Sequence, residues 1–340
     1  MPRVLAFLNP RLGTRNVGDV FIEDSAKRIL VHDRERSVDV DPRRPLSPAD
    51  IDRINSTHAA VILGTNLWYR DLFKPGRWML GADDLRRIRV PVVPFGVGTS
   101  RRFDEDNAFG PETLELLHRI HGSCAAGSAR DPRTVEALEG AGIRNVAMTG
   151  CPTLFRTLSP RWQLRDPRRS RRVTVTLRAG QRRNSRPLLR RLGELGLEPV
   201  IAAQKPGDRF SRWRIPFGAP APERIFGFDI APYVRLVEEC AGAVGWRLHG
   251  NMLHLAHGNP AIFFADASRA HSFCEGFGLP CVSCPDGERV PAAAVIEHVD
   301  RLLDTSTFAE FPSRYAAARA EMARFLEANG LEHRLAREEA

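Results

Sequence analysis

Short apolar runs that alternate with helical patterns constrain the fold of this chain more than any other feature. Such runs lie at residues 3–8 (RVLAFL), 59–64 (AAVILG) and 90–98 (VPVVPFGVG), and the apolar residues after the first run recur at helical spacing. Continuous β-branched strands that are each followed by a helix are typical of a parallel sheet with helices on both faces. We therefore expect an α/β fold.

A second series of the same kind begins after residue 170. Its strand-like runs lie at residues 171–177, 197–203, 241–246 and 260–264. The segment between the two series, 158–170, is rich in proline and arginine, which indicates a linker. Because one hydrophobic core rarely serves 340 residues, we expect two Rossmann-like parallel-sheet domains that face a cleft, at 1–160 and 171–305. We expect the helix of the C-terminal segment, 306–340, to pack back across both domains.

The composition is that of a globular protein with an excess of arginine. The formal net charge is +9, yet only three of the 50 basic residues are lysines, a bias typical of GC-rich coding, so we expect no nucleic-acid partner. The densest basic run, 161–191, is either a solvated surface or a patch for an anionic partner. No window approaches the roughly 18 to 20 apolar residues of a membrane span. The start has too short an apolar core for a signal peptide, so we expect a cytoplasmic protein; the oligomeric state stays open.

The cysteines and paired histidines point to neither disulfides nor a metal site. Six cysteines are spread through a chain in which we find no secretion signal, so we expect them to be reduced. Cys281 and Cys284 form a lone Cys-x-x-Cys without a second pair at zinc spacing. His254 and His257 lie on an apolar helix without a carboxylate nearby, which indicates packing or capping. We expect no metal.

Loops that follow the predicted strands carry the candidate ligand-binding residues, because ligands collect at the carboxyl ends of parallel strands. On the first three strands these residues are polar or small: Asn16, Gly18, Asp19, Thr65, Asn66, Gly96 and Gly98. The third glycine of a dinucleotide fingerprint is missing after residue 98, so a Rossmann dehydrogenase is poorly supported. Arg130 precedes Asp131, which has the chemistry of a helix N-cap, and we expect the arginine to be freer to face a cleft.

The most informative strand end is Arg247-Leu248-His249, between the strand at 241–246 and a helix. Free N–H groups and the dipole at a helix N-terminus favour an anion, and a guanidinium there can bind carboxylate or phosphate in bidentate fashion. An imidazole two residues away can move a proton near neutral pH. The alternative is that Arg247 pairs with a structural carboxylate and His249 packs in the core.

Taken in order, the motifs resemble those of the polysaccharide pyruvyl transferase family. They are NVGDVFI, AAVILGTN, PVVPFGVG, SARDPRTVEALEGAGI, VTVTLRAG and GWRLHGNMLHLAHGNPAIFFADASRAHSFCEGFGLP, which together span most of the chain up to about residue 282. The resemblance implies a two-domain fold like that of GT-B glycosyltransferases. It also implies transfer of the pyruvyl group of phosphoenolpyruvate to two hydroxyls of a sugar as a ketal, with release of phosphate and without a cofactor or obligatory metal.

The resemblance also implies roles for individual residues. It assigns His249 as the acid/base group, and it assigns donor binding to Arg247, the backbone of Leu248, Arg178 and Arg130. Asn16 and Asp19 would face the cleft from the acceptor side, where a carboxylate could orient or deprotonate a sugar hydroxyl. The alternative for Asp19 is a helix cap.

Two departures from the family pattern bear on the acceptor. This chain has Gly64-Thr65-Asn66 where many relatives carry three glycines, and Cys151-Pro152 where many carry Asp-Pro. The acceptor is therefore either a sugar of a polysaccharide or a small-molecule scaffold.

Alternative functions remain open at this point. One is a GT-B glycosyltransferase that uses a nucleotide-sugar, although we find no carboxylate for a ribose in the second domain. Another is a non-catalytic carbohydrate-binding relative. The segment at 66–80 interleaves aromatic and basic residues, as in a peripheral membrane contact that would suit a lipid-linked acceptor; core packing or an acceptor-site loop is the alternative.

Overall fold

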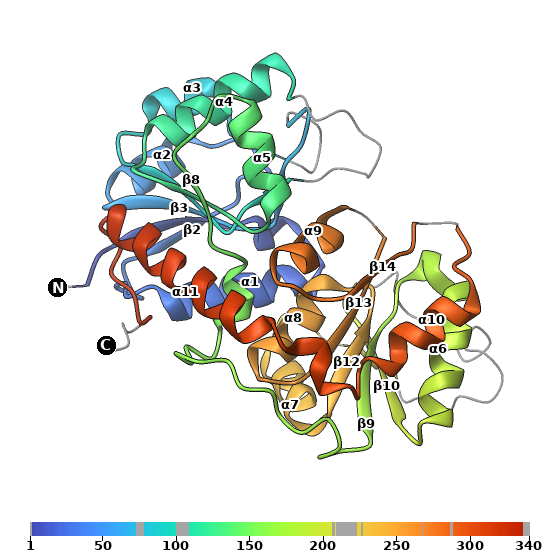
Figure 1. Cartoon of the computed structure of the whole chain (residues 1–340). Helices are drawn as coiled ribbons and strands as arrows, with labels where there is room; N and C mark the ends of the chain where they lie inside the picture. The colour runs from blue at the N-terminus through green and yellow to red at the C-terminus, as the bar shows by residue number, and fades with distance from the viewer. Residues whose placement is uncertain are drawn as a thin grey trace. The chain divides into compact units, whose positions relative to one another are not determined.

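The computed structural model describes residues 2–72, 78–99, 109–205, 208, 223–225, 227–266, 268–285 and 288–335. The chain divides into two compact units (Figure 1). Unit 1 comprises residues 1–14, 22–160 and 316–340, and unit 2 comprises residues 15–21 and 161–315.

The sheet of unit 1 is parallel, with the strand order β2–β1–β3–β5. Its strands are β1 (Leu5–Leu8), β2 (Val38–Val40), β3 (Ala59–Leu63) and β5 (Val92–Phe95). A parallel pair, β7 (Gly127–Ala129) and β8 (Val146–Met148), continues beyond β5 through a bridge between Val97 and Ala129. The two short strands β4 (Asn66–Trp68) and β6 (Gly98–Thr99) pair at the carboxyl ends of β3 and β5.

Alternate residues of β1 and β3 face opposite sides of this sheet, as the period of a strand requires. Ala6, Leu8 and Ile62 join a core built with the helices on one face: α2 (Pro48–Asn55), α4 (Pro111–Gly122) and α5 (Pro132–Gly140). On the other face, the ring of Phe95 lies 5.7 Å from that of Phe325 in α11 (Phe311–Ala328). Figure 1 shows α11 and α4 on opposite sides of the strands.

Unit 2 contains a larger parallel sheet with the strand order β11–β10–β9–β12–β13–β14. Its strands are β9 (Arg172–Thr176), β10 (Glu198–Ala203), β11 (Glu223–Ile225), β12 (Gly242–Gly245), β13 (Ala261–Ala265) and β14 (Cys281–Ser283). The chain builds outwards from β9 first on one side and then on the other. The strand order therefore reverses between β9 and β12, which is where ligands bind in sheets of this kind.

Helices cover both faces of the sheet of unit 2. Figure 1 shows α6 (Arg182–Glu194) and α10 (Ala292–Asp300) on one face, with α7 (Ala231–Glu239) and α8 (Leu248–Ala256) on the other. The remaining helix after β13 is α9 (Ser268–Gly276). Short 3₁₀ segments in the two units lie at Pro10–Gly13, Pro152–Phe155, Ala179–Gln181 and Thr305–Phe308, and unit 1 also contains α3 (Ala82–Arg87). The predicted fold class, two Rossmann-like parallel-sheet units, is confirmed.

The second unit begins after residue 160, where the predicted first domain ends, but residues 15–21 of that predicted domain count with unit 2 and residues 316–340 count with unit 1. Helix α1 (Val17–Ile29) begins in unit 2 and ends in unit 1. Its residues Val17 and Phe21 belong to the core of unit 2, where the ring of Phe21 lies 4.6 Å from that of Tyr233. In the predicted linker, Trp162 is buried and its ring lies 4.6 Å from that of Phe311, so this part of the segment is packed within unit 2.

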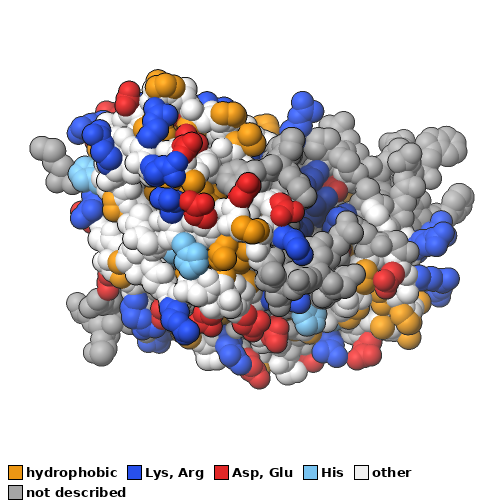
Figure 2. Space-filling model, turned by 90° about the horizontal axis from the view of Figure 1, so that it is seen from above, with side chains coloured by type: hydrophobic (Ala, Val, Ile, Leu, Met, Phe, Trp, Pro, Cys, Tyr) orange, Lys and Arg blue, Asp and Glu red, His pale blue; other side chains and the backbone are white. Residues whose placement is uncertain are grey.

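Surface features of the described residues bear on the predicted partners. Basic and acidic side chains are intermixed on the face that Figure 2 shows. None of the helices in the described ranges combines the length and apolar character needed to traverse a lipid bilayer. Within the segment at 66–80, Trp68 and Trp78 are buried against each other with ring centroids 5.9 Å apart, and residues 73–77 lie outside the described residues. Core packing therefore accounts for these two tryptophans.

Three buried histidines predict an acid-sensitive fold. Burial lowers the pKa of His121 and His298 to about 4 and that of His254 to about 3. An unfolded histidine titrates near about 6.5, so below that pH the unfolded state binds more protons and the free energy of unfolding falls as the pH falls. We expect a loss of about 1.4 kcal/mol per pH unit for each histidine until its folded pKa is reached. A melting temperature that is the same at about pH 7 and about pH 5 would contradict this expectation.

Candidate functional site

The switch point of unit 2 brings Arg247 next to the end of β9. Gly245 of β12 pairs in register with Thr176 of β9, and the backbone N–H of Arg247 donates to the Thr176 hydroxyl at 3.2 Å. Gly245 has a φ of +141°, and a side chain there would collide with the Thr176 backbone, so only glycine fits. Arg247 is the N-cap residue of α8 and Leu248 is the first, buried residue of that helix.

The guanidinium of Arg247 forms an ion pair with the carboxylate of Asp208. The other carboxylate oxygen of Asp208 accepts a hydrogen bond from the backbone N–H of Lys205 at 3.1 Å. The Nε atom of Arg247 is buried and has no hydrogen-bond partner among the described residues. The alternative in which Arg247 pairs with a carboxylate is therefore present in the structure, and the Nε donor of the same guanidinium stays available to another group.

His249 lies against the start of α1. A side chain on Gly18 would place its Cβ 3.2 Å from Nδ1 of the imidazole, so the glycine gives the ring room. The side-chain oxygen of Asn16 accepts from the Gly18 N–H at 3.3 Å, and the Val17 N–H donates to the Gln204 carbonyl at 3.0 Å. We expected Asn16, Gly18 and Asp19 on the first domain, but the structure counts them with unit 2 because Val17 and Phe21 pack in its core.

Lys205 adds a cation that the sequence analysis missed. It follows β10, and its charge interacts with those of Arg247, Asp19, Arg269 and Asp208. Burial lowers the pKa of Lys205, and the charges of Arg247 and Arg269 act in the same direction. Lys205 is nevertheless exposed as a whole residue. The rule that ligands collect at strand ends, applied to the predicted strand at 197–203, would have found this lysine.

Arg178, which follows β9, forms an ion pair with Asp266, which follows β13 and is 1% exposed at its side chain. We define the strand-end group as His249, the charged residues that follow these strands and those whose charges interact with Lys205. Its members are Arg178, Lys205, Arg247, His249, Arg269, Asp19, Asp208 and Asp266. Leaving the histidine aside, four cations face three carboxylates. This arrangement can attract an anion while its own carboxylates order the cations.

Arg130 lies in unit 1, not in the strand-end group, and its side chain is 0% exposed. It donates to the side-chain oxygen of Asn66 and forms an ion pair with Asp131 at 3.5 Å. Any side chain at Gly98 would collide with this guanidinium. The expectation that Arg130 is free to face a cleft is therefore wrong, because unit 1 encloses it. Asp131 is the N-cap of α5, as expected, and accepts from the Thr134 N–H at 3.0 Å.

The two departures from the family pattern lie close to this arginine. Thr65 and Asn66 are both buried, and Asn66 supplies an acceptor to Arg130 that glycine could not. Gly64 packs against the Gly96 backbone, and Gly96, with a φ of +65°, packs against Pro152. Cys151 is fully buried, and burial raises the pKa of its thiol while the charge of Arg130 opposes the shift. These residues form the interior of unit 1 at the ends of β3 and β5.

Asn66→Ala is expected to destabilise unit 1. The Nη1 atom of Arg130 already lacks a hydrogen-bond partner among the described residues, and the substitution would remove the acceptor of Nη2 as well. Leaving a buried charged donor unsatisfied costs about 2 to 3 kcal/mol. The free energy of unfolding in urea measures this loss, and Asn66→Asp, which keeps an acceptor, should recover most of it. A loss below about 0.5 kcal/mol would mean that the guanidinium does not need this acceptor.

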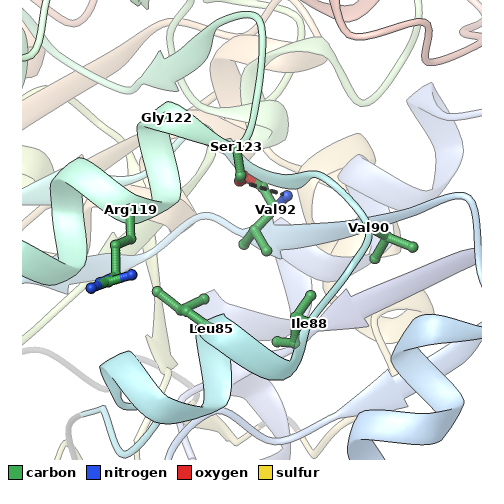
Figure 3. A pocket seen from close by; sticks show the side chains of 7 residues that line it. All are labelled: Leu85, Ile88, Val90, Val92, Arg119, Gly122 and Ser123. Carbon is green, nitrogen blue, oxygen red and sulfur yellow. Dashed lines mark hydrogen bonds between the residues drawn. The ribbon is translucent and has the colours of Figure 1, made fainter.

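A pocket of about 330 Å³ lies elsewhere in unit 1. It is lined by Leu85, Ile88, Val90, Val92, Arg119, Gly122 and Ser123 (Figure 3). Val92 begins β5, whereas the predicted residues Gly96 and Gly98 follow its end, so the pocket contains none of the predicted site residues. In the described part of the chain, no three His, Cys, Asp or Glu side chains come together as a metal site would require.

A family model described as polysaccharide pyruvyl transferase matches residues 16–268. No curated protein matches the sequence.

Solved structures are similar to this chain over its whole length. S. aureus MnaA in a co-structure with UDP is 11% identical, with a TM-score of 0.55 and coverage of 94% of this chain and 95% of that one. A Listeria monocytogenes protein described as a UDP-N-acetylglucosamine 2-epimerase is 12% identical, with a TM-score of 0.51 and coverage of 96% and 93%. Anabaena HepE in complex with UDP and glucose is 11% identical, with a TM-score of 0.50 and coverage of 96% and 98%. At these identities the likeness concerns the fold alone, which is of the GT-B type.

Proposed function

The chain belongs to the polysaccharide pyruvyl transferase family, and from this we propose that its strand-end group binds phosphoenolpyruvate as the donor of a pyruvyl group. The acceptor is a sugar or glycan, two hydroxyls of which become bridged by a pyruvate ketal while phosphate is released. The observation that carries the proposal is that Arg247 and His249 both lie at the start of α8, at the switch point of unit 2. The reaction as proposed needs neither a nucleotide nor a metal.

Donor binding follows from the charges. Phosphoenolpyruvate carries a carboxylate and a phosphate, and the strand-end group offers the cations Arg178, Lys205, Arg247 and Arg269. The N–H groups in the first turn of α8 lie beside Arg247, and the positive end of the helix dipole favours an anion there. A guanidinium whose Nε donor is unoccupied can hold one of the two anionic groups.

The proton inventory of the reaction suits a histidine. Transfer of a proton from His249 to C3 of the enol turns the methylene into a methyl group and makes C2 an oxocarbenium-like centre. One sugar hydroxyl adds to C2 and loses its proton, which restores the protonated imidazole. The second hydroxyl then replaces phosphate at C2, and its proton leaves with the phosphate. Asp19, buried in the first turn of α1 beside the Gly18–His249 contact, is the carboxylate proposed to orient the acceptor.

The test is phosphate release from phosphoenolpyruvate in the presence of a panel of glycan acceptors, with and without a metal chelator. We expect release that depends on the acceptor and does not depend on the chelator. A protein that releases no phosphate, yet is stabilised against heating by a nucleotide-sugar, is a glycosyltransferase instead. Stabilisation by a glycan alone indicates a carbohydrate-binding relative without catalysis.

A further inference from the structure

Asp208 has a partner for each of its carboxylate oxygens, although no motif points to it. Oδ1 pairs with the guanidinium of Arg247, and Oδ2 accepts from the backbone N–H of Lys205 at 3.1 Å. The side chain of Asp208 is 3% exposed and that of Arg247 is 11% exposed. A buried carboxylate is costly unless its oxygens are satisfied, and here one cation and one N–H satisfy them.

The two partners of Asp208 carry like charges. Burial lowers the pKa of Lys205, the charges of Arg247 and Arg269 act in the same direction, and those of Asp19 and Asp208 raise it. If Asp208 were removed, Asp19 would be the one carboxylate left among the charges that act on Lys205. The remaining charges of that set, Arg247 and Arg269, are cations. The arginine side chain would then have lost the acceptor that fixes the plane of its guanidinium.

We propose that Asp208 is a positioning residue that holds Arg247 and the backbone of Lys205 together, so that their two side chains form one site for a ligand with two anionic groups. This inference rests on the proposed function for the identity of that ligand, phosphoenolpyruvate. Arg247 supplies the planar fork for one group and Lys205 a point charge for the other. Asp208 itself does not touch the donor and acts through the arginine.

Asp208→Asn separates positioning from simple charge. The substitution makes the site more positive, so long-range attraction alone predicts tighter binding of an anion. Loss of the fixed guanidinium predicts weaker binding, because a charge-assisted hydrogen bond no longer holds its plane. We expect the Kd of phosphoenolpyruvate to rise about tenfold in Asp208→Asn and further in Asp208→Ala, with kcat reduced less than the Kd is raised.

A double-mutant cycle tests whether Asp208 acts through Arg247. In an Arg247→Ala background, Asp208→Asn should change the Kd by less than about twofold, because the group that it positions is gone. The matched control is Asp300→Asn, which removes another arginine-bound carboxylate of unit 2; Asp300 holds Arg191 at 2.6 and 3.1 Å. We expect donor binding to be unchanged in the control.

Two results would overturn the inference: donor binding by Asp208→Asn that is as tight as or tighter than that of the parent, or effects of the two substitutions that simply add. Calorimetry with inorganic phosphate repeats the comparison without turnover, so that failure of the inference can be told from failure of the proposed function. If Asp208→Asn binds phosphate more weakly but the unsubstituted protein transfers no pyruvyl group, the positioning role of Asp208 stands and phosphoenolpyruvate is not the donor. If Asp208→Ala does not fold, the isosteric Asn variant still decides.

Discussion

Arg247→Ala should lower kcat/KM for pyruvyl transfer about 100- to 1000-fold. Arg247 is the N-cap residue of α8 at the switch point, the Nε donor of its guanidinium is buried without a hydrogen-bond partner among the described residues, and Asp208 pairs with its Nη2 atom. Truncation removes the fork that binds an oxyanion, and with it the planar donor that Asp208 positions. Phosphate release at varied phosphoenolpyruvate measures the effect.

Arg247→Lys refines this prediction. A lysine keeps the charge but cannot form two parallel hydrogen bonds, so we expect it to recover only part of the loss. Arg191→Ala is the matched control, because Arg191 also has an aspartate partner in unit 2 but lies on α6, outside the strand-end group. If Arg247→Ala and the unsubstituted protein bind phosphoenolpyruvate with equal affinity, the donor does not bind at Arg247.

His249→Ala should lower kcat by about 100- to 10,000-fold, the range that a positioned general acid contributes. We expect the Kd of the donor to change far less than kcat, because the imidazole acts on C3 and the cations hold the charged groups. In deuterated water, the parent should produce a ketal with deuterium in its new methyl group. His249→Gln retains a polar side chain but has no group that can donate a proton near neutral pH, so we expect it to be as slow as the alanine variant.

The matched control is His257→Gln, since His257 caps the other end of the same helix. It should turn over at the parent's rate. A His249→Ala variant that keeps its full kcat would show that another group protonates C3, and Lys205, whose pKa is lowered, would be the first residue to test in its place.

Continuous apolar runs predicted the strands that form the centre of each sheet. The runs at 59–64 and 241–246 became β3 and β12 with boundaries shifted by a residue or less. The strands without a predicted run are two or three residues long, and two examples are β7, with the sequence Gly-Ser-Ala, and β14, with the sequence Cys-Val-Ser. Three residues are too few for a hydrophobic period, and the pairing partner that makes each segment a strand lies far away in the sequence.

The sequence predicted those site residues whose position depends only on the local order of strand and helix. Arg247 and His249 follow a strand and open a helix, and both features are local. Asp208 pairs with a residue 39 positions away, and no pattern in the sequence announces that contact. For Asp19 the helix was predicted correctly but its unit was not, because the packing of Phe21 on Tyr233 decides where the first turns of α1 belong.

Arg130 shows the opposite limit. Its place after a strand suggested a ligand-binding role. Buried polar groups that connect loops also lie at strand ends, and Arg130 is one of them: it donates to Asn66 and forms an ion pair with Asp131. Only the fold distinguishes these cases, since both kinds of arginine follow strands. What differs is burial: the side chain of Arg130 is 0% exposed, whereas those of Arg247 and Arg178 are 11% and 29% exposed.

Because α1 and α11 each pass from one unit to the other, neither unit corresponds to a single stretch of the gene. Cutting the chain at residue 160 would separate Val17 and Phe21 from the core that they complete, and would take Gly18 away from His249. Recombination between relatives at the linker would therefore join His249 of one parent to the helix start of the other. Chimaeras should function only when residues 15–21 are exchanged together with residues 161–315, and engineering of specificity by exchange of halves has to keep these two segments from the same parent.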